Sequence, residues 1–154
     1  ILYEKGLIAS PMFYISAYLE RNRPVYYERL LAVSRDGDWN GWIAFFLHAI
    51  EEQAGTNGRK AKAILDLYAE MKQTVPEVTR SQYATAAIDA LFKAPVFSSA
   101  EFFEQAGMSR RAGERILQQL REQEIIAVLA EGGGRRATTY VFPRLLAITE
   151  GGRL

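Results

Sequence analysis

The sequence contains no cysteine and a single histidine, His48. Without cysteine the chain has no disulfide framework, no thiolate zinc site, no iron–sulfur cluster and no cysteine nucleophile. One histidine also excludes metal sites that are built from several imidazoles. The longest apolar run, Trp42 to Ile50, carries His48 within it and is far shorter than the ~20 residues of a membrane-spanning helix. We therefore expect a cytoplasmic protein with no membrane partner.

The chain also lacks an excess of charge of either sign. Nineteen Lys and Arg residues face 18 Asp and Glu residues, and the formal net charge is +1. This balance is far from the strongly basic composition of a dedicated DNA-binding protein. The length of 154 residues suits one mid-sized domain or two small ones, and 49% apolar residues are typical of an ordinary globular protein.

Helical patterns fill the first half of the sequence. Pro11 lies near the start of a first helix that ends at about Asn22, and Arg23-Pro24 opens a second one. Asp36-Gly37-Asp38 is a turn, after which Asp38 is a candidate N-cap for a third helix, Trp39 to Gln53. Because that third helix is apolar on almost every side, we expect it to be deeply packed.

Glycine and proline suggest where these helices stop. The segment Gly55 to Gly58 is expected to interrupt or bend the path, and a long amphipathic helix that follows is expected to end before Pro76. Val75-Pro76-Glu77 is the best boundary in the chain, which gives domains over residues 1–75 and 80–150. Ile1 to Gly6 has the pattern of a helix end with a glycine C-cap, which predicts a fragment of a longer protein.

The second half shows an ordered series of patterns. A helix over 81–92 and a short extended link precede a helix over 100–105 that Ser98 or Ser99 can cap. A tight turn, Ala106-Gly107-Met108, and a helix capped by Ser109 follow. Strand-like residues 125–129 and 138–142 then enclose a Gly-rich, charged loop. This order predicts a winged helix-turn-helix with a small β-hairpin, or else an α/β domain of the same order without a ligand.

Several segments of the first third resemble one family closely. They look like the region just C-terminal to the catalytic loop of Fic (Fic/DOC) proteins, in which "G-L-[L/I]-x-x-P-x-[L/F]-Y-[L/I]-S-x-Y", "N-R-x-x-Y-Y" and "G-D-W-x-x-W-[I/L]-x-F-F-L" follow one another. The matching residues here are Lys5 to Ser16, Asn22-Arg23, Tyr26-Tyr27, Leu30, Val33, Gly37 to Trp39 and Trp42 to Leu47. We therefore expect a mainly α chain, with a helical remnant of a Fic domain over 1–75 and a winged helix over 80–150.

The resemblance implies an activity for a full-length parent rather than for this chain. Fic proteins typically transfer AMP from ATP to a protein hydroxyl, with Mg²⁺, through the signature H-P-F-x-[D/E]-G-N-G-R-x-x-R. That signature is absent from these 154 residues, and we expect it upstream of Ile1. The chain itself is therefore expected to have no catalytic residues, no metal site and no cofactor, while ATP and Mg²⁺ are expected for a parent adenylyltransferase. The protein substrate of such a parent is not identified by the sequence.

Two features invite a catalytic interpretation that we reject, and a third feature is a set of aromatic residues. Thr56-Asn57-Gly58-Arg59 contains "N-G-R", but no histidine or acidic residue precedes it at the motif's spacing, so a surface turn is expected. His48 is expected to be a packed or half-exposed structural histidine. The aromatic residues at helical spacing are expected to form a core or a seam between helices. The alternative is a face that the missing catalytic helices normally cover, which without them is an exposed apolar patch through which copies associate as a homodimer. This set is Phe13, Tyr14, Tyr26, Tyr27, Trp39, Trp42, Phe45 and Phe46.

The winged-helix pattern predicts a surface for double-stranded DNA. Arginine suits phosphate contacts and guanine, and glutamine can read adenine. The candidate residues are Ser109, Arg110, Arg111, Glu114, Arg115 and Gln118 at the helix, with Arg135, Arg136, Thr138 and Thr139 in the hairpin. We expect the five arginines of this set to lie on one side of the domain. Because residues 107–136 hold six arginines and four glutamates, their net charge is only +2, and protein–protein contact or dimerisation stays open as the alternative role.

Overall fold

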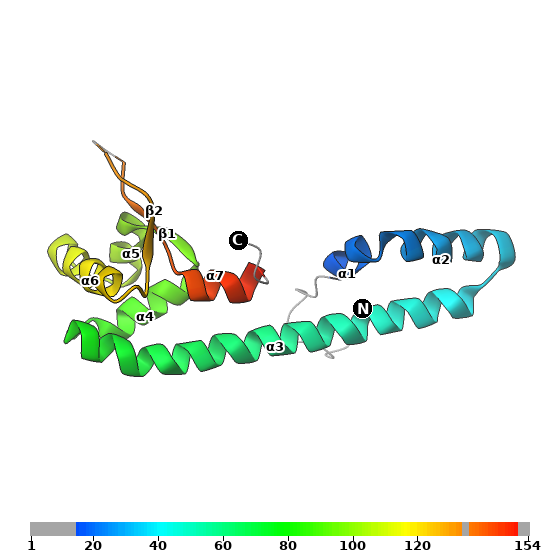
Figure 1. Ribbon diagram of the computed structural model, residues 1–154, viewed down its shortest axis with the longest axis horizontal. Helices are drawn as coiled ribbons and strands as arrows, with labels where there is room; N and C mark the ends of the chain where they lie inside the picture. The colour runs from blue at the N-terminus through cyan, green and yellow to red at the C-terminus, as the bar shows by residue number, and fades with distance from the viewer. Residues whose placement is uncertain (1–14, 134–135, 151–154) are drawn as a thin grey trace. The chain divides into compact units, whose positions relative to one another are not determined.

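The computed structural model describes residues 15–133 and 136–150. Within these residues the chain is mainly helical, with seven helices and one three-stranded antiparallel sheet (Figure 1). The chain forms two compact units, unit 1 over Ile1–Arg59 and unit 2 over Lys60–Leu154. The expectation of a mainly α chain with a small β element is confirmed.

Unit 1 contains α1 (Ser16–Arg21), α2 (Arg23–Asp36) and the first part of α3 (Trp39–Thr79). Pro24 lies in the first turn of α2, where a missing N–H costs nothing. Gly37 ends α2 in the left-handed conformation, with φ of 68°. The Oδ1 of Asp38 then accepts a hydrogen bond from the Gly41 N–H at 2.9 Å, as expected of an N-cap. The second helix, the turn and this cap are confirmed, whereas the expected start of the first helix and the expected helix end at 1–6 lie outside the described residues.

Helix α3 runs without a break through the glycine-rich segment. The expected stop at Gln53 and the expected turn over Gly55 to Gly58 are therefore wrong. Local side-chain pairs support the helix here: Gln53 donates to the Asn57 Oδ1 at 3.0 Å, and Arg59 donates to the Thr56 Oγ1 at 3.1 Å. Such pairs at i,i+3 and i,i+4 stabilise a helix surface, and they offset part of the cost of two glycines. The "N-G-R" tripeptide thus lies on a helix rather than in a turn.

Helix α3 also continues past Pro76, so the expected end before that residue is wrong. Proline removes one hydrogen bond of the helix because it has no N–H. Val75 and Thr79, which flank it, are fully buried in the core of unit 2, and the Thr79 hydroxyl donates to the Val75 carbonyl at 2.8 Å. Burial of these neighbours outweighs the local preference of proline. The helix ends at Thr79, and the next residue, Arg80, is a non-glycine residue with φ of 44°.

Alanine at Gly55 or Gly58 is expected to stabilise α3. Glycine inside a helix costs roughly 0.5–1 kcal/mol relative to alanine. A Cβ at Gly55 would meet only the Arg59 guanidinium at 3.5 Å, and one at Gly58 would meet nothing within 4 Å. Each variant should raise the free energy of unfolding by about this amount, with slower hydrogen exchange of the amides around it. Gly107→Ala is the opposite control, because its φ of +60° disfavours a side chain. Faster exchange in Gly55→Ala or Gly58→Ala would mean that this segment is not helical.

Unit 2 combines the end of α3 with four helices and the sheet. The sheet has the order β1-β3-β2, with Val96 and Ala127 both opposite Val141. The β2–β3 hairpin extends beyond the helices of this unit (Figure 1). The elements are α4 (Ala84–Lys93), β1 (Val96–Ser98), α5 (Ser99–Gln105), α6 (Arg110–Glu122), β2 (Ala127–Ala130), β3 (Thr139–Val141) and α7 (Pro143–Glu150).

The core of unit 2 is continuous and draws on every helix in it. Three residues of α3 contribute to it, namely Leu67, Met71 and Val75. The largest fully buried side chains from the rest of the unit are Ile88, Leu91, Phe102, Ile116, Leu117, Leu120, Ile126 and Phe142. Burial of this set supplies the main stabilisation of the unit and fixes α5 and α6 against the sheet.

Helix α7 follows β3 directly and was not expected from the sequence. Pro143 begins it, Leu145 is buried, and Arg144 forms two hydrogen bonds with the Glu70 carboxylate of α3, at 2.5 and 2.7 Å. Lys60 donates to the Thr149 carbonyl at 2.5 Å. The local signal that could have predicted it is proline at the first helical position, with apolar residues three apart.

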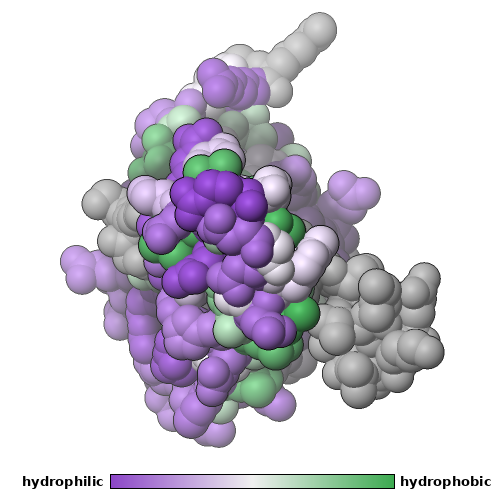
Figure 2. Space-filling model, turned by 90° about the vertical axis from the view of Figure 1, so that its right-hand side faces the viewer, coloured by the Kyte–Doolittle hydropathy of each residue, from purple (hydrophilic) through white to green (hydrophobic). Residues whose placement is uncertain are grey.

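The expectation of a deeply packed third helix is wrong for the part of α3 in unit 1. One face packs: Tyr18 lies 5.9 Å from Phe45 and Tyr26 lies 5.8 Å from Trp42, measured between ring centroids. The opposite face is open, with Trp39 at 61% and Leu47 at 60% exposure. Figure 2 shows small apolar patches (green) scattered over a mostly polar surface (purple) on the side it views.

His48 and several members of the aromatic set are more exposed than expected. The His48 side chain is 64% exposed, with Glu51 and Glu52 at 3.8 and 4.0 Å, so it is neither packed nor half-exposed. Tyr27 and Phe46 are exposed as well. The prediction that the aromatic set forms a core or a seam holds for Trp42 and Phe45 and is wrong for Trp39, Tyr27 and Phe46; Phe13 and Tyr14 lie outside the described residues.

Candidate nucleic-acid interface

Two short polar caps and one glycine fix the pair α5 and α6. The Ser98 Oγ accepts from the Glu101 N–H while the Glu101 carboxylate accepts from the Ser98 N–H, which is a complete capping box. Gly107 supplies a left-handed residue with φ of 60° in the turn. The Ser109 Oγ then accepts from the Ala112 N–H at 3.4 Å at the start of α6. The predicted caps and the predicted turn are confirmed.

Helix α6 presents one buried and one exposed face. Gly113, Ile116, Leu117 and Leu120 form the buried face. Gly113 lies where α5 and α6 approach most closely, because a Cβ built there would overlap the Phe103 ring. The exposed face therefore carries the polar candidates, which are Arg110, Arg111, Glu114, Arg115 and Gln118.

The tip of the hairpin is held by backbone pairing. Gly133 and Arg136 exchange two hydrogen bonds, of 3.1 and 3.0 Å, and the Thr138 Oγ1 accepts from the Gly132 N–H at 3.1 Å. Thr139 lies in β3 opposite Ser98. Of the predicted hairpin residues, Arg136 and the two threonines are thus placed, and Arg135 lies outside the described residues.

A hollow of about 310 Å³ lies between α6 and the hairpin. It brings Arg110 and Glu114 of α6 together with Arg136 and Thr138 of the hairpin. Ser99, Phe103 and Tyr140 also line it, and the sequence reasoning did not single them out. The alternation of Tyr140 with Thr139 in a strand is the one signal that could have placed Tyr140 on the side facing α6.

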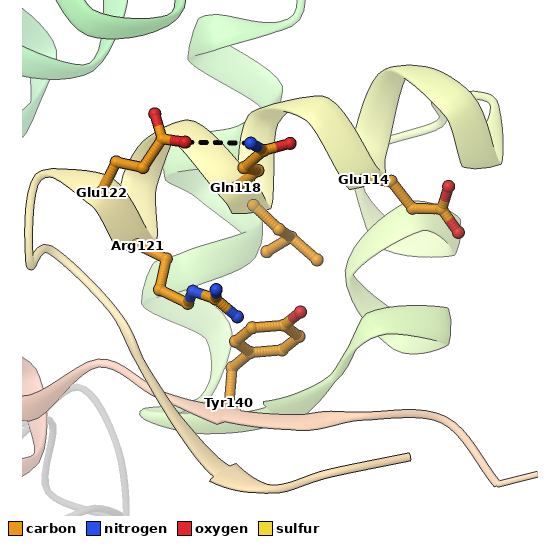
Figure 3. Close-up of a pocket in the computed structure, with 6 residues that line it drawn as sticks. Glu114, Gln118, Arg121, Glu122 and Tyr140 are labelled. Atoms are coloured by element: carbon orange, nitrogen blue, oxygen red, sulfur yellow. Dashed lines mark hydrogen bonds between the residues drawn. The ribbon is translucent and has the colours of Figure 1, made fainter. Parts of the chain in front are cut away.

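A second hollow along α6 carries both signs of charge. Figure 3 shows Arg121 of α6 extending toward the ring of Tyr140 in β3, while Gln118 donates to the Glu122 carboxylate at 2.9 Å. Glu114 also lines this hollow. Burial raises the pKa of the Tyr140 hydroxyl above its ordinary value.

Glu114 partly neutralises the first arginine of α6. Arg110 Nε donates to the Glu114 Oε1 at 2.7 Å, one helical turn apart. This hydrogen bond raises the pKa of the Arg110 guanidinium, which remains charged at every practical pH. Because both side chains are largely exposed, the pair contributes little to stability, but it keeps a carboxylate beside a guanidinium that could otherwise bind phosphate.

Arg115 lies away from this arrangement. It lines a different hollow, of about 250 Å³, with Arg80 and Ser81, and its guanidinium donates to the Thr79 carbonyl at 3.4 Å. Arg110 and Arg136 therefore share one hollow along α6, while Arg115 contributes to another. Arg111 is exposed on the same helix.

In the part of the chain that the structure describes, no group of three or more His, Cys, Asp or Glu residues could hold a metal ion. Among those same residues, none of the helices has the length and apolar character that crossing a bilayer requires. No protein-family model matches the sequence.

Acid is expected to weaken unit 2 through two carboxylates. Hydrogen bonds from the Ser98 N–H and Oγ hold the pKa of Glu101 below its ordinary value of 4.5, and Arg144 lowers the pKa of Glu70 in the same way. A pKa that is lower in the folded state stabilises the protein above the unfolded pKa, and this contribution is lost as the pH falls through the folded pKa. The temperature at the midpoint of thermal unfolding should therefore decrease as the pH is lowered below about 4.5.

The acid effect can be assigned to one of these groups by substitution. Glu101→Gln should make the decline of the denaturation midpoint with acid less steep, because an amide in place of the carboxylate does not titrate. Glu104→Gln, on the same helix, serves as the control. If the unfolding midpoint of Glu101→Gln decreases with acid as steeply as that of the wild type, a role for this cap in the pH dependence is contradicted.

Proposed function

We propose that unit 2 is a winged helix-turn-helix that binds double-stranded DNA in a regulatory role, through α6 and the β2–β3 hairpin. The observation that carries the proposal is the hollow shared by Arg110 of α6 and Arg136 of the hairpin. In a winged helix, the second helix of the helix-turn-helix pair enters the major groove and the hairpin reaches the backbone or the minor groove. Arginines on both elements suit that division of contacts.

The local order of elements supports this assignment. Helix α5, a turn with a left-handed glycine, helix α6 and an antiparallel hairpin follow one another within 99–141. The N-terminus of α6 is exposed and carries Arg110 and Arg111 in its first turn, where the positive end of the helix dipole adds to their attraction for phosphate.

A fluorescence-anisotropy titration tests the proposal. The full chain is titrated into a labelled mixed-sequence duplex and into the duplex upstream of its own gene, at about 50 and 200 mM salt. For a surface that makes four phosphate contacts, the affinity should fall roughly 100-fold between these two salt concentrations. Tighter binding to the upstream duplex would support a regulatory role, whereas absence of binding at both salt concentrations would refute the proposal.

A double substitution locates the binding surface. Arg110→Ala with Arg111→Ala removes two cations and leaves Glu114 without its partner, so affinity at 50 mM salt should fall by about ten-fold or more. Arg21→Ala with Arg23→Ala, on the exposed surface of unit 1, changes the net charge equally and should have little effect. Equal losses in the two double variants would show that net charge, rather than α6, governs binding.

The second candidate function is contact between copies of the chain, and the open face of α3 in unit 1 favours it. Trp39, Ile43 and Leu47 lie on that face, each more than half exposed. Exposed large apolar side chains that share one helix face are typical of interaction sites. Light scattering after size exclusion should then give a mass that rises with concentration, and Trp39→Gln with Leu47→Gln should abolish the rise. A monomer at all concentrations would exclude this role.

We further propose that the chain is the C-terminal part of a Fic-type protein adenylyltransferase. Two of the resembling segments meet in unit 1, where the rings of Tyr26 and Trp42 lie 5.8 Å apart. A longer chain that includes the signature histidine should, with ATP and Mg²⁺, add AMP to a protein or to itself. Mass spectrometry that shows no such addition would refute this part of the proposal.

A further inference from the structure

The turn between α3 and α4 and the first half of α6 form a corner that contains two arginines. We define the Arg80–Arg115 corner by these two residues with Ser81 and Gln82, which line the same hollow of about 250 Å³. The Arg115 guanidinium is held there by its hydrogen bond to the Thr79 carbonyl at 3.4 Å. Arg80 has φ of 44° and its N–H donates to the Pro76 carbonyl at 2.9 Å, so its backbone position is fixed by the end of the helix.

The charge of this corner differs from that of the other hollows along α6. No aspartate or glutamate is among the described residues that line it. Each of the three hollows on the hairpin side includes Glu114. Two guanidinium groups on one hollow without a lining carboxylate attract an anion more strongly than Arg110 does beside Glu114. Phosphate suits them because arginine forms charge-assisted, bidentate hydrogen bonds with its oxygens.

The position of the corner relates it to a bound duplex. A helix that lies in the major groove has a phosphate backbone on each of its two sides. The hairpin, with Arg136, lies along one side of α6. The Arg80–Arg115 corner lies along α6 as well, on a hollow that shares none of the hairpin's residues. The two arginines are therefore placed to reach the second backbone when the hairpin reaches the first.

We infer that Arg80 and Arg115 bind phosphate oxygens of the DNA strand on the side of α6 away from the hairpin. This inference rests on the proposed DNA-binding function. It adds Arg80, which lies outside the helix-turn-helix pair, to the binding surface, and it gives Arg115 a role in positioning the duplex rather than in reading bases. Contacts of this kind are independent of sequence, so their loss should weaken binding equally on all duplexes.

Salt titrations of single variants test the inference. Arg80→Ala should lower affinity about ten-fold at 50 mM salt on both the mixed and the upstream duplex, and should reduce the slope of log K against log salt by about 1. Arg115→Lys keeps a cation for the Thr79 carbonyl and should bind more weakly than the wild type, because an ammonium cannot form the bidentate contact. Lys93→Ala, at the far end of α4, removes one exposed cation and should leave the slope unchanged.

The possible results distinguish a role of the Arg80–Arg115 corner from DNA binding by α6 and the hairpin. Steep, salt-dependent binding by the wild type with an unchanged slope in Arg80→Ala would overturn the role of the corner and leave DNA binding by α6 intact. A slope reduced equally in Lys93→Ala would also overturn it, because any exposed cation would then serve. Absence of binding by the wild type would refute both. Circular dichroism of each variant at the titration temperature verifies that the fold is retained.

Discussion

Replacing Phe102 with alanine is expected to lower the free energy of unfolding of unit 2 by about 3–5 kcal/mol. The side chain is 1% exposed and lies at the centre of the α5–α6 pair. Its ring stacks on Phe97 of β1 with centroids 5.6 Å apart and meets Phe103 edge-on at 6.3 Å. Truncation removes these contacts and leaves a cavity, so both the helix pair and its docking on the sheet are weakened.

Hydrogen exchange measured by mass spectrometry assigns this loss to unit 2. Both tryptophans, Trp39 and Trp42, lie in unit 1, so tryptophan fluorescence does not report on α5 and α6. Phe46→Ala makes the same chemical change in unit 1, where the residue is 38% exposed, and should leave exchange in 96–126 unaltered. Protection of 96–126 that is the same in Phe102→Ala and the wild type would contradict the described core.

Replacing Glu114 with lysine is expected to tighten DNA binding by about 100-fold at 50 mM salt, and Glu114→Gln by about ten-fold, since each added phosphate contact contributes a factor of roughly ten there. Glutamine releases Arg110 from its 2.7 Å hydrogen bond, and lysine adds a second cation at the same place. At 200 mM salt the gain per contact falls to about four-fold, because each released counterion gains less entropy when the salt concentration of the bulk solution is higher.

A charge change of the same size elsewhere serves as the control. Glu28→Lys alters the exposed surface of α2 in unit 1 by two charges and should change affinity little. Weaker binding by Glu114→Gln would mean that the carboxylate itself contacts a base, as a glutamate can through the cytosine amino group. That result would assign Glu114 to recognition of a base. It would contradict the proposal that Glu114 weakens phosphate binding by pairing with Arg110.

Local signals were sufficient to predict most of unit 2. Ser98 and Ser109 both cap helices, and the glycine between them takes the left-handed conformation that a tight turn requires. The strands β2 and β3 lie in the two segments that the sequence predicts, and their ends fall within one or two residues of the predicted ends. These features depend on hydrogen bonds between residues close in sequence, which is why the pattern alone predicts them.

Features that depend on distant residues were missed. Proline at position 76 predicts a helix end, but burial of Val75 and Thr79 against the core of unit 2 keeps the helix intact. The segment Pro95 to Phe97 was expected to be only an extended link; its last two residues belong to strand β1 (Val96–Ser98), because Thr139 to Val141 pair with that strand. In each case contacts with residues distant in the sequence, rather than local propensity, determine the structure.

The charge arrangement of the candidate site could be predicted only in part. The sequence indicates which arginines lie on α6, but not that Arg110 bonds to Glu114 while Arg115 reaches back to the end of α3. That split depends on how α3 and α4 pack beside α6. It is the reason that Arg80, some 30 positions earlier in the chain, joins the proposed surface.

Residue-resolved NMR titration of the full chain with a short duplex tests the central claim most directly. Binding through α6 predicts that changes in amide chemical shift concentrate in Ser109 to Gln118, around Gly133 and Arg136 of the hairpin, and at Arg80 to Gln82. These changes should diminish as salt is raised. Shifts confined to α2 and the first part of α3, or no shifts at low salt, would contradict a DNA-binding surface on α6 and would favour contact between copies through unit 1.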